Sequence, residues 1–250
     1  MPISAAENRF VMDQLTQRSR DDIRALWDAA VRLPDVDFFT YVSDAFPDIV
    51  IPYHQLAAEF AASAFEEDFP ALAVTAVVAD PPPVEALRKS AQWALGADGI
   101  TAIDRRAATT QRHIYDGSRD TTATNAEASG LRWVRIARPN ACAFCRLLAS
   151  RAAVDSGFAS QQSASRVVGR RGGARGSRKL GEKYHDDCQC TVKAVPAGRN
   201  TLDYLYQEEP EAAFTAEQYL NEYNKARDEA DSGDTKAILS QWRQLSADIT

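Results

Sequence analysis

The four cysteines of this chain form two closely spaced pairs. Cys142 and Cys145 make a C-x2-C pair, Cys188 and Cys190 make a C-x-C pair, and His185 lies three residues before the second pair. Thiolate sulfur and imidazole nitrogen are ligands that Zn²⁺ favours, and a structural zinc site takes four of them in a tetrahedron. The five residues therefore predict a structural zinc site, and the sequence leaves open which four of them bind.

Two alternatives to a metal site remain open. In an oxidising compartment the four cysteines would form two disulfides, and in a closed core they would be small buried thiols. The segment from Met1 to Glu7 has neither the basic stretch nor the apolar stretch of an export signal, so we expect the chain to fold in a reducing cytoplasm. We therefore favour thiolates on a metal, with His185 as a ligand or as the partner of a ligand.

The sequence offers no standard catalytic arrangement. It lacks the G-x-S-x-G and H-E-x-x-H motifs, and every cysteine is paired at ligand spacing rather than standing alone as a nucleophile would. Asp186 and Asp187 beside His185 are the one hint of acid–base chemistry. His54 and His113 fall in helical stretches and are interpreted as buried helix histidines. We predict no catalytic residue and favour a structural role over an enzymatic one.

A strongly basic segment, residues 161–183, separates the two cysteine pairs. It carries a charge of +6 inside a chain whose net charge is −6, and glycines interrupt it. A flexible Gly/Arg segment can neutralise phosphates without reading bases, and the absence of aromatic residues gives no reason to expect base stacking. The predicted nucleic-acid contacts are Arg166, Arg170, Arg171, Arg175, Arg178, Lys179 and Lys183. A solvated loop and an acidic protein surface are the alternatives.

The elements that must position these residues are mainly α-helical, and the fold class predicted is mainly α with a small α+β domain. We expect a helical domain over residues 1–125, an α+β zinc domain over 126–196 and a helical tail over 197–250. The sequence contains no run of 18 apolar residues, so no membrane span is predicted.

Within the zinc domain, Leu131 to Arg138 and Thr191 to Val195 are expected to be strands, and Ala141 to Ala152 a helix. Cys188 and Cys190 would then alternate on a strand and point to one face. The small polar residues 117–130 predict a loop at the domain boundary.

The helices of the first domain are predicted from caps and prolines. Ser4 and Glu7 have the spacing of a capping box, and Pro34 is expected to end the helix of residues 19–33 that precedes it. A short helix is expected before Pro47, and a separate alanine-rich helix from Tyr53 to Glu66. Residues 103–115 predict a further helix, broken by Asp116 and Gly117.

The order of motifs in the second half of the chain resembles that of the Mu F-like minor head proteins of tailed phages. The matching residues are Trp133-Val134-Arg135, Cys142-x-x-Cys145, Leu147-Leu148-Ala149-Ser150-Arg151, His185-x-x-Cys188-x-Cys190 and Val195-Pro196. The similar form is seen in phages of high-GC bacteria, and some of those proteins are labelled capsid maturation proteases. The motifs cover about a quarter of the chain, and Ala152-Ala153 departs from the glycine expected after the arginine.

The resemblance implies a virion protein of low copy number that is made in the host cytoplasm and acts in phage head morphogenesis. It implies a place in the head interior at the portal vertex, with the portal protein and the major capsid or scaffold protein as partners. It also implies contact with packaged double-stranded DNA and no membrane during assembly. The alternatives are a capsid maturation protease and a toxin-like or DNA-modifying domain that uses His185.

Overall fold

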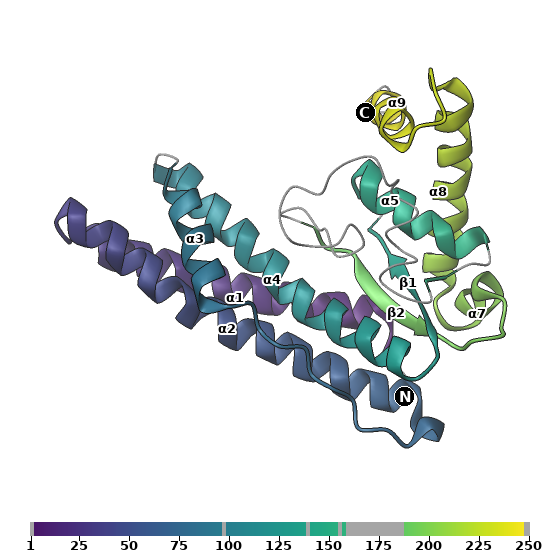
Figure 1. The fold of residues 1–250 in the computed structure, drawn as a ribbon, viewed down its shortest axis with the longest axis horizontal. Coiled ribbons are helices and arrows are strands. Elements are labelled where there is room, and N and C mark those ends of the chain that lie inside the picture. The colour runs from purple at the N-terminus through teal and green to yellow at the C-terminus, as the bar shows by residue number, and fades with distance from the viewer. Residues whose placement is uncertain (1–2, 97–98, 139–140, 155–156, 159–187, 248–250) are drawn as a thin grey trace. The chain divides into compact units, whose positions relative to one another are not determined.

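The computed structural model describes residues 3–96, 99–138, 141–154, 157–158 and 188–247 (Figure 1). This part of the chain is mainly α-helical with one two-stranded sheet, which confirms the predicted fold class. It divides into two compact units, of which the first holds residues 3–121 and Cys188 and the second holds the other described residues. The predicted three-domain division stays a prediction. None of the described helices has the length and apolar character needed to cross a bilayer.

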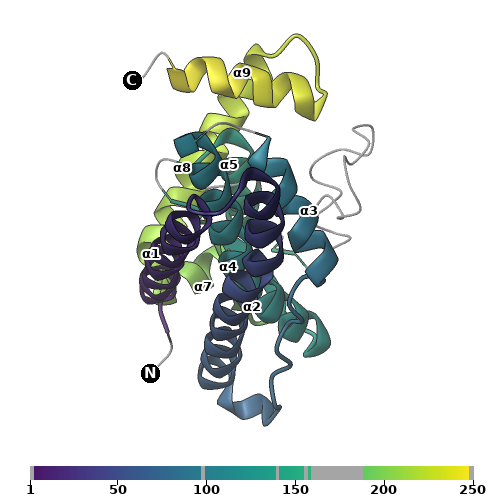
Figure 2. The ribbon, with the colours of Figure 1, turned by 90° about the vertical axis from the view of Figure 1, so that its left-hand side faces the viewer.

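Four helices build the first unit: α1 (Ala5–Ala30), α2 (Asp35–Asp68), α3 (Val84–Leu95) and the larger part of α4 (Gly99–Ala128). Figures 1 and 2 show α1, α2 and α4 lying lengthwise beside one another, with α3 against α2. The predicted capping box is confirmed, because the Ser4 hydroxyl accepts from the Glu7 N–H while the Glu7 carboxylate accepts from the Ser4 N–H. A single 3-10 turn, η1 (Pro70–Leu72), follows α2.

Helix α2 runs unbroken through both of its internal prolines, so the predicted break between Pro47 and Pro52 is wrong. Each interior proline removes a backbone hydrogen bond and costs about 3 kcal/mol or more. Burial of the flanking residues offsets this cost: Phe46 and Val50 are fully buried, as are Ala57, Ala58 and Ala61 further along the helix. The buried alanines keep α2 slim where neighbouring helices pack on it.

Helix α4 continues to Ala128, so the predicted loop over residues 117–130 is also wrong. Most of its small polar side chains, among them Ser118, Thr121, Thr122 and Asn125, are buried rather than solvated. Within the first unit, Gln111 accepts from Arg20 of α1 at 2.9 Å, and Ser118 pairs with Asn8 at 3.4 Å. Gly117 does not break the helix, because its missing Cβ leaves room for the main chain of α2.

The second unit contains the sheet and the remaining helices. Strands β1 (Arg132–Ile136) and β2 (Thr191–Val195) pair antiparallel, with Arg132 opposite Val195 and Ile136 opposite Thr191. Both predicted strands are therefore confirmed, and β2 has the predicted bounds. Trp133 also bridges to Phe158, with the two ring centroids 4.8 Å apart. Nearly every residue of both strands is buried.

Helix α5 (Ala143–Ala149) and the 3-10 turn η2 (Ser150–Val154) together occupy the predicted helix over residues 141–152. The C-terminal helices are α7 (Thr201–Glu208), α8 (Pro210–Glu229) and α9 (Thr235–Ala247). α5, α7, η2 and α9 all contact α8, and α9 crosses it (Figures 1 and 2).

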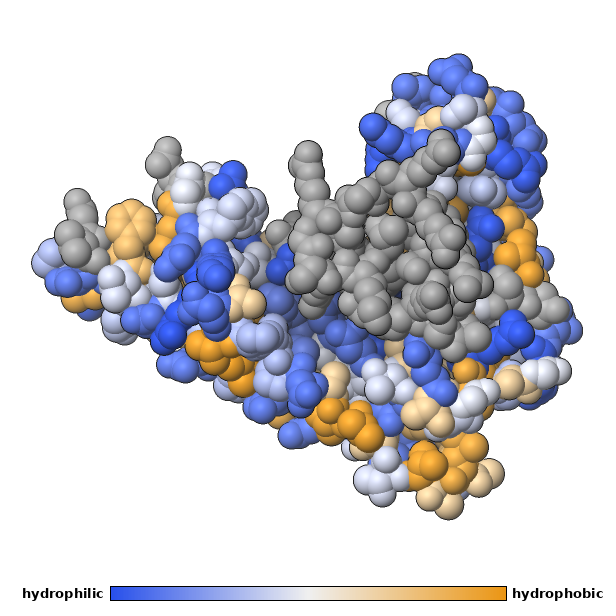
Figure 3. Space-filling view, in the orientation of Figure 1, coloured by the Kyte–Doolittle hydropathy of each residue, from blue (hydrophilic) through white to orange (hydrophobic). Residues whose placement is uncertain are grey.

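Many of the exposed apolar side chains on the first unit are scattered along α2 and the segment after it. They appear in Figure 3 as separate patches divided by polar residues. The largest exposed groups there are Phe39, Tyr41, Leu56, Val74, Val77 and Val78. Separate apolar residues of this kind are ordinary on a protein surface.

Candidate metal centre

Three of the four cysteines come together in the structure. The Sγ atoms of Cys145, Cys188 and Cys190 all lie within 4.8 Å of one another, and all three residues are buried. They come from two segments, 145 and 188–190, that the sequence separates by 42 residues. The predicted convergence of the two cysteine pairs is therefore found for three of their four members.

The spacing of these sulfurs suits a metal rather than a disulfide. The Cys145 and Cys190 Sγ atoms are 3.7 Å apart, and none of the four cysteines is joined in a disulfide. A disulfide would need about 2.05 Å. A tetrahedral ion with Zn–S bonds of ~2.3 Å spaces its sulfur ligands about 3.8 Å apart. The donor set of three buried sulfurs thus fits a thiolate-binding metal ion of the size of zinc.

The first cysteine pair sits at the N-terminus of α5, as predicted. Cys142 is the N-cap residue, with extended backbone, and its Sγ accepts from the Cys145 N–H at 3.5 Å. Helix N-termini stabilise thiolates, because the first N–H groups and the helix dipole present partial positive charge. Cys142 is exposed and lies outside the group of three sulfurs. It therefore stands beside the cluster on the same helical turn as Cys145.

Helix α5 is held in place by the residue that follows Cys145. The Arg146 guanidinium donates to the Ala141 carbonyl at 2.6 Å and to the Glu222 carboxylate of α8 at 3.0 Å, and it lies over the Tyr219 ring. Burial raises the pKa of Tyr219 to about 12, so its hydroxyl stays protonated near neutral pH. The Trp242 indole N–H of α9 donates to the same Glu222 carboxylate. The helical tail thereby fixes the helix that carries Cys142 and Cys145.

The second cysteine pair immediately precedes β2. Both sulfurs belong to one cluster, which confirms that Cys188 and Cys190 face the same side. Their predicted location on a strand is wrong, because β2 begins only at Thr191 and residues 188–190 form an irregular lead into it. Without sheet pairing on both sides, this lead can bend two closely spaced sulfurs toward one ion.

Within the first unit, a buried arginine contacts Cys188. Arg119 of α4 donates from Nη2 to the Cys188 carbonyl at 2.9 Å, and the same nitrogen lies 3.5 Å from Cys188 Sγ. Its Nη1 pairs with the Asp116 carboxylate at 3.3 Å, and its Cζ lies 5.0 Å from the centre of the Tyr115 ring. The sequence interpretation missed Arg119 and Asp116, because it took Asp116 and Gly117 as a helix break and residues 117–130 as a loop. Once the segment is read as helix, their i, i+3 spacing is the signal.

Several predicted site residues lie outside the described residues, so their prediction stands as made. They are His185 and the seven basic residues Arg166, Arg170, Arg171, Arg175, Arg178, Lys179 and Lys183. The two other histidines are buried on helices, as expected. The His54 ring nitrogens lie 2.9 Å from the His113 carbonyl and 3.1 Å from the Asp80 carbonyl.

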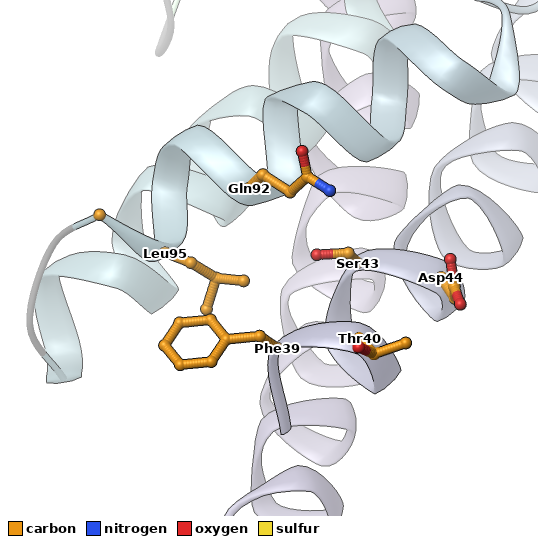
Figure 4. A pocket seen from close by; sticks show the side chains of 7 residues that line it. Phe39, Thr40, Ser43, Asp44, Gln92 and Leu95 are labelled. Carbon is orange, nitrogen blue, oxygen red and sulfur yellow. The ribbon is translucent and has the colours of Figure 1, made fainter. Parts of the chain in front are cut away.

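A surface pocket of about 390 Å³ lies between α2 and α3 (Figure 4). Phe39 and Leu95 line one side, and Ser43, Asp44 and Gln92 line the other. The one acid in this lining, Asp44, is paired with Arg88 at 3.1 Å. None of the lining residues is a cysteine or histidine, so the pocket is separate from the candidate metal centre in its chemistry.

Comparison with known proteins places almost the whole chain in one family. The family model described as VG15 protein matches residues 3–242. The chain matches no curated protein and no solved structure. The matched range includes all four cysteines and every described helix from α1 to α8.

Proposed function

The chain belongs to the VG15 protein family, which is phage-associated, and from this premise we propose that it is a minor head protein of a tailed phage. In this proposal it acts inside the head at the portal vertex during head assembly. The observation that carries the proposal is the cysteine cluster in a mainly helical protein. The three cysteines of the cluster belong to the motifs through which the sequence resembles the Mu F-like minor head proteins.

We propose Zn²⁺ as the ion of the cluster, held by Cys145, Cys188 and Cys190. The fourth ligand is either Cys142, which caps the same helix, or His185. A bound zinc ion would act as a structural cross-link that ties α5 to the lead into β2. This cross-link suits a two-stranded sheet, because a sheet of two strands is only marginally stable by itself. Metal binding would then be part of the folding free energy of this region.

The proposed partners are the portal protein, the major capsid or scaffold protein, and packaged double-stranded DNA. The DNA contact is assigned to the basic segment, residues 161–183, on the strength of its charge. An otherwise acidic protein would direct such a contact to one place, since the rest of its charge repels phosphate.

The proposal is tested by co-expression with the portal, capsid and scaffold proteins of the same phage. We expect the chain to copurify with the portal protein and to be retained in assembled heads at low copy number. A Cys145→Ser variant, which lacks one proposed ligand, should be retained less. Heads that assemble without the chain, together with no copurification with the portal protein, would contradict the proposed role.

The same co-expression separates a structural protein from a maturation protease. We expect the capsid and scaffold proteins to stay uncleaved when they are co-expressed with the chain. A defined cleavage product that disappears with His185→Ala would assign the chain to the protease alternative instead.

A further inference from the structure

We infer that Arg119 is the fixed cation of the candidate metal centre, and that it positions Cys188 and stabilises its thiolate in the metal-bound state. The inference rests on the proposed metal-binding role of the cluster. It adds a residue of α4, outside both cysteine pairs, to the determinants of metal affinity.

The geometry around Arg119 is specific on both sides of the guanidinium. Nη2 faces Cys188, at 2.9 Å from its carbonyl oxygen and 3.5 Å from its sulfur, while Nη1 faces the Asp116 carboxylate at 3.3 Å. The Tyr115 ring lies 5.0 Å from Cζ. Arg119 and Asp116 each expose about 1% of their side chain, so water does not screen these contacts.

The charge of the metal centre explains why a cation is needed at this place. A divalent ion with three thiolates carries a net charge of about −1, and with four thiolates about −2. A buried negative charge is costly unless a cation or hydrogen bonds compensate it. Arg119 supplies a guanidinium cation at this place, and its N–H groups stabilise the charged form of the sulfur that they face.

Asp116 fixes the orientation of the Arg119 guanidinium. Its carboxylate holds the far edge of the guanidinium, and the Tyr115 ring lies against the group, so the Nη2 edge is turned toward Cys188. The Asp116–Arg119 pair is neutral as a whole, but its positive end is the one next to the sulfur. The pair therefore acts on the cluster as an oriented dipole rather than as a free charge.

The hydrogen bond from Arg119 to the Cys188 carbonyl also positions Cys188, in addition to the effect of the charge. Cys188 belongs to the irregular segment that precedes β2. The hydrogen bond from Arg119 Nη2 to the Cys188 carbonyl fixes the main chain two residues before Cys190. A lysine could supply the charge at this place, but it cannot hold the carbonyl and Asp116 at once with the planar geometry of a guanidinium. Arg119 is thus a positioning residue that acts on the metal through Cys188.

Arg106 provides a matched control on the same helix. It is also about 1% exposed and lies over an aromatic ring, at 5.4 Å from the Trp27 ring centre. It donates a hydrogen bond to the Ala91 carbonyl of α3, far along α4 from the residue that faces Cys188. Arg119→Gln and Arg106→Gln therefore remove equally buried cations, only one of which faces the cluster.

The test measures zinc affinity by competition with a chromogenic chelator, for folded wild type, Arg119→Gln, Arg119→Lys and Arg106→Gln. We expect Arg119→Gln to weaken zinc binding by about 10- to 100-fold, as loss of a residue that orients a metal ligand typically does. Arg119→Lys should recover part of this loss. Arg106→Gln should bind zinc with an affinity close to that of wild type, because it lies away from the sulfurs.

The absorption spectrum of the cobalt-substituted protein is a second measurement. Substitution of an arginine that only stabilises the fold would leave this spectrum unchanged. The thiolate-to-cobalt charge-transfer bands should shift in Arg119→Lys and Arg119→Gln and remain unchanged in Arg106→Gln. Equal zinc affinity and equal cobalt spectra for Arg119→Gln and wild type would overturn the role of Arg119. If Arg119→Gln does not fold, equal values for Arg119→Lys and wild type would overturn its role in positioning Cys188. Wild-type protein that binds neither ion would instead overturn the metal centre itself.

Discussion

The α-carbon of Gly117 on α4 lies so close to the main-chain carbonyl of His54 on α2 that an added Cβ would sit 2.5 Å from the His54 oxygen. Real Cβ atoms do not approach an oxygen that closely, so the contact between the two helices depends on a residue without a side chain. The Asp116-Gly117 pair therefore marks a crossing point of two helices and not the end of one.

Gly117→Ala should destabilise the protein, although glycine to alanine usually stabilises a helix by about 0.5–1 kcal/mol. The added methyl group would force α2 and α4 apart, and overpacking of this kind costs about 1–3 kcal/mol. Urea unfolding followed by circular dichroism measures the change in the free energy of unfolding.

The exposed Thr124 of the same helix supplies the reference for this comparison. Thr124→Ala should be more stable than Thr124→Gly by about 1 kcal/mol, because only helix propensity distinguishes alanine from glycine at an exposed position. If Gly117→Ala raises stability as alanine does at position 124, the two helices do not need this contact.

The cysteine cluster should hold about one zinc ion per chain, as measured by elemental analysis of protein purified under reducing conditions. Cys145→Ser, Cys188→Ser and Cys190→Ser should each lose the metal and lower the melting temperature of the protein. Among Cys142→Ser and His185→Ala, the variant that loses metal identifies the fourth ligand. Metal-free wild type, or two disulfides formed under the same conditions, would refute the zinc site.

Lys193 on β2 and Glu209, the residue between α7 and α8, form a buried ion pair with a 3.6 Å contact. Removal of one member leaves the other charge buried, and such changes cost about 3–5 kcal/mol. Lys193→Met should therefore lower the free energy of unfolding strongly, whereas Lys193→Met with Glu209→Gln should recover most of the loss. A double variant as unstable as the single one would mean that each residue acts through other contacts.

The basic segment, residues 161–183, should bind duplex DNA weakly and without sequence preference. With about four phosphates neutralised, the binding constant should fall with salt at a log–log slope of roughly −3.6, and the dissociation constant should lie near 10⁻⁴ to 10⁻⁶ M, on the order of non-specific binding. A salt titration of wild type is compared with a variant in which Arg170, Arg171, Arg175 and Arg178 are changed to serine. Equal binding by the two proteins, or a slope near zero, would favour a solvated loop or an acidic protein partner.

Local signals predicted the parts of the fold that local interactions determine. The sequence predicted β2 at its observed bounds, the Ser4 and Glu7 spacing located the start of α1, and the first cysteine pair was expected at the start of the helix that proves to be α5. The convergence of Cys145 with Cys188 and Cys190 was also predictable, because paired cysteines at ligand spacing carry their own chemistry.

The errors arose where tertiary packing overrides local preference. Pro47, Pro52 and Gly117 are helix breakers in isolation, but each lies inside a long helix whose burial outweighs the local cost. The polar residues of α4 resemble a loop until their partners on α1 are known, such as Asn8 for Ser118. The contact of Arg119 with Cys188 joins residues 69 positions apart, and no short-range sequence pattern predicts it.

The 42 residues between Cys145 and Cys188 have a consequence for how this family can vary. Bringing the ends of so long a segment together costs about 3 kcal/mol of chain entropy, which a metal ion with three thiolates can readily offset. That cost grows only with the logarithm of length, so a segment twice as long would add just ~0.6 kcal/mol. The segment that carries the basic residues can therefore lengthen or shorten over evolutionary time without loosening the cysteine cluster. Selection on whatever this segment contacts would then act independently of selection on the fold.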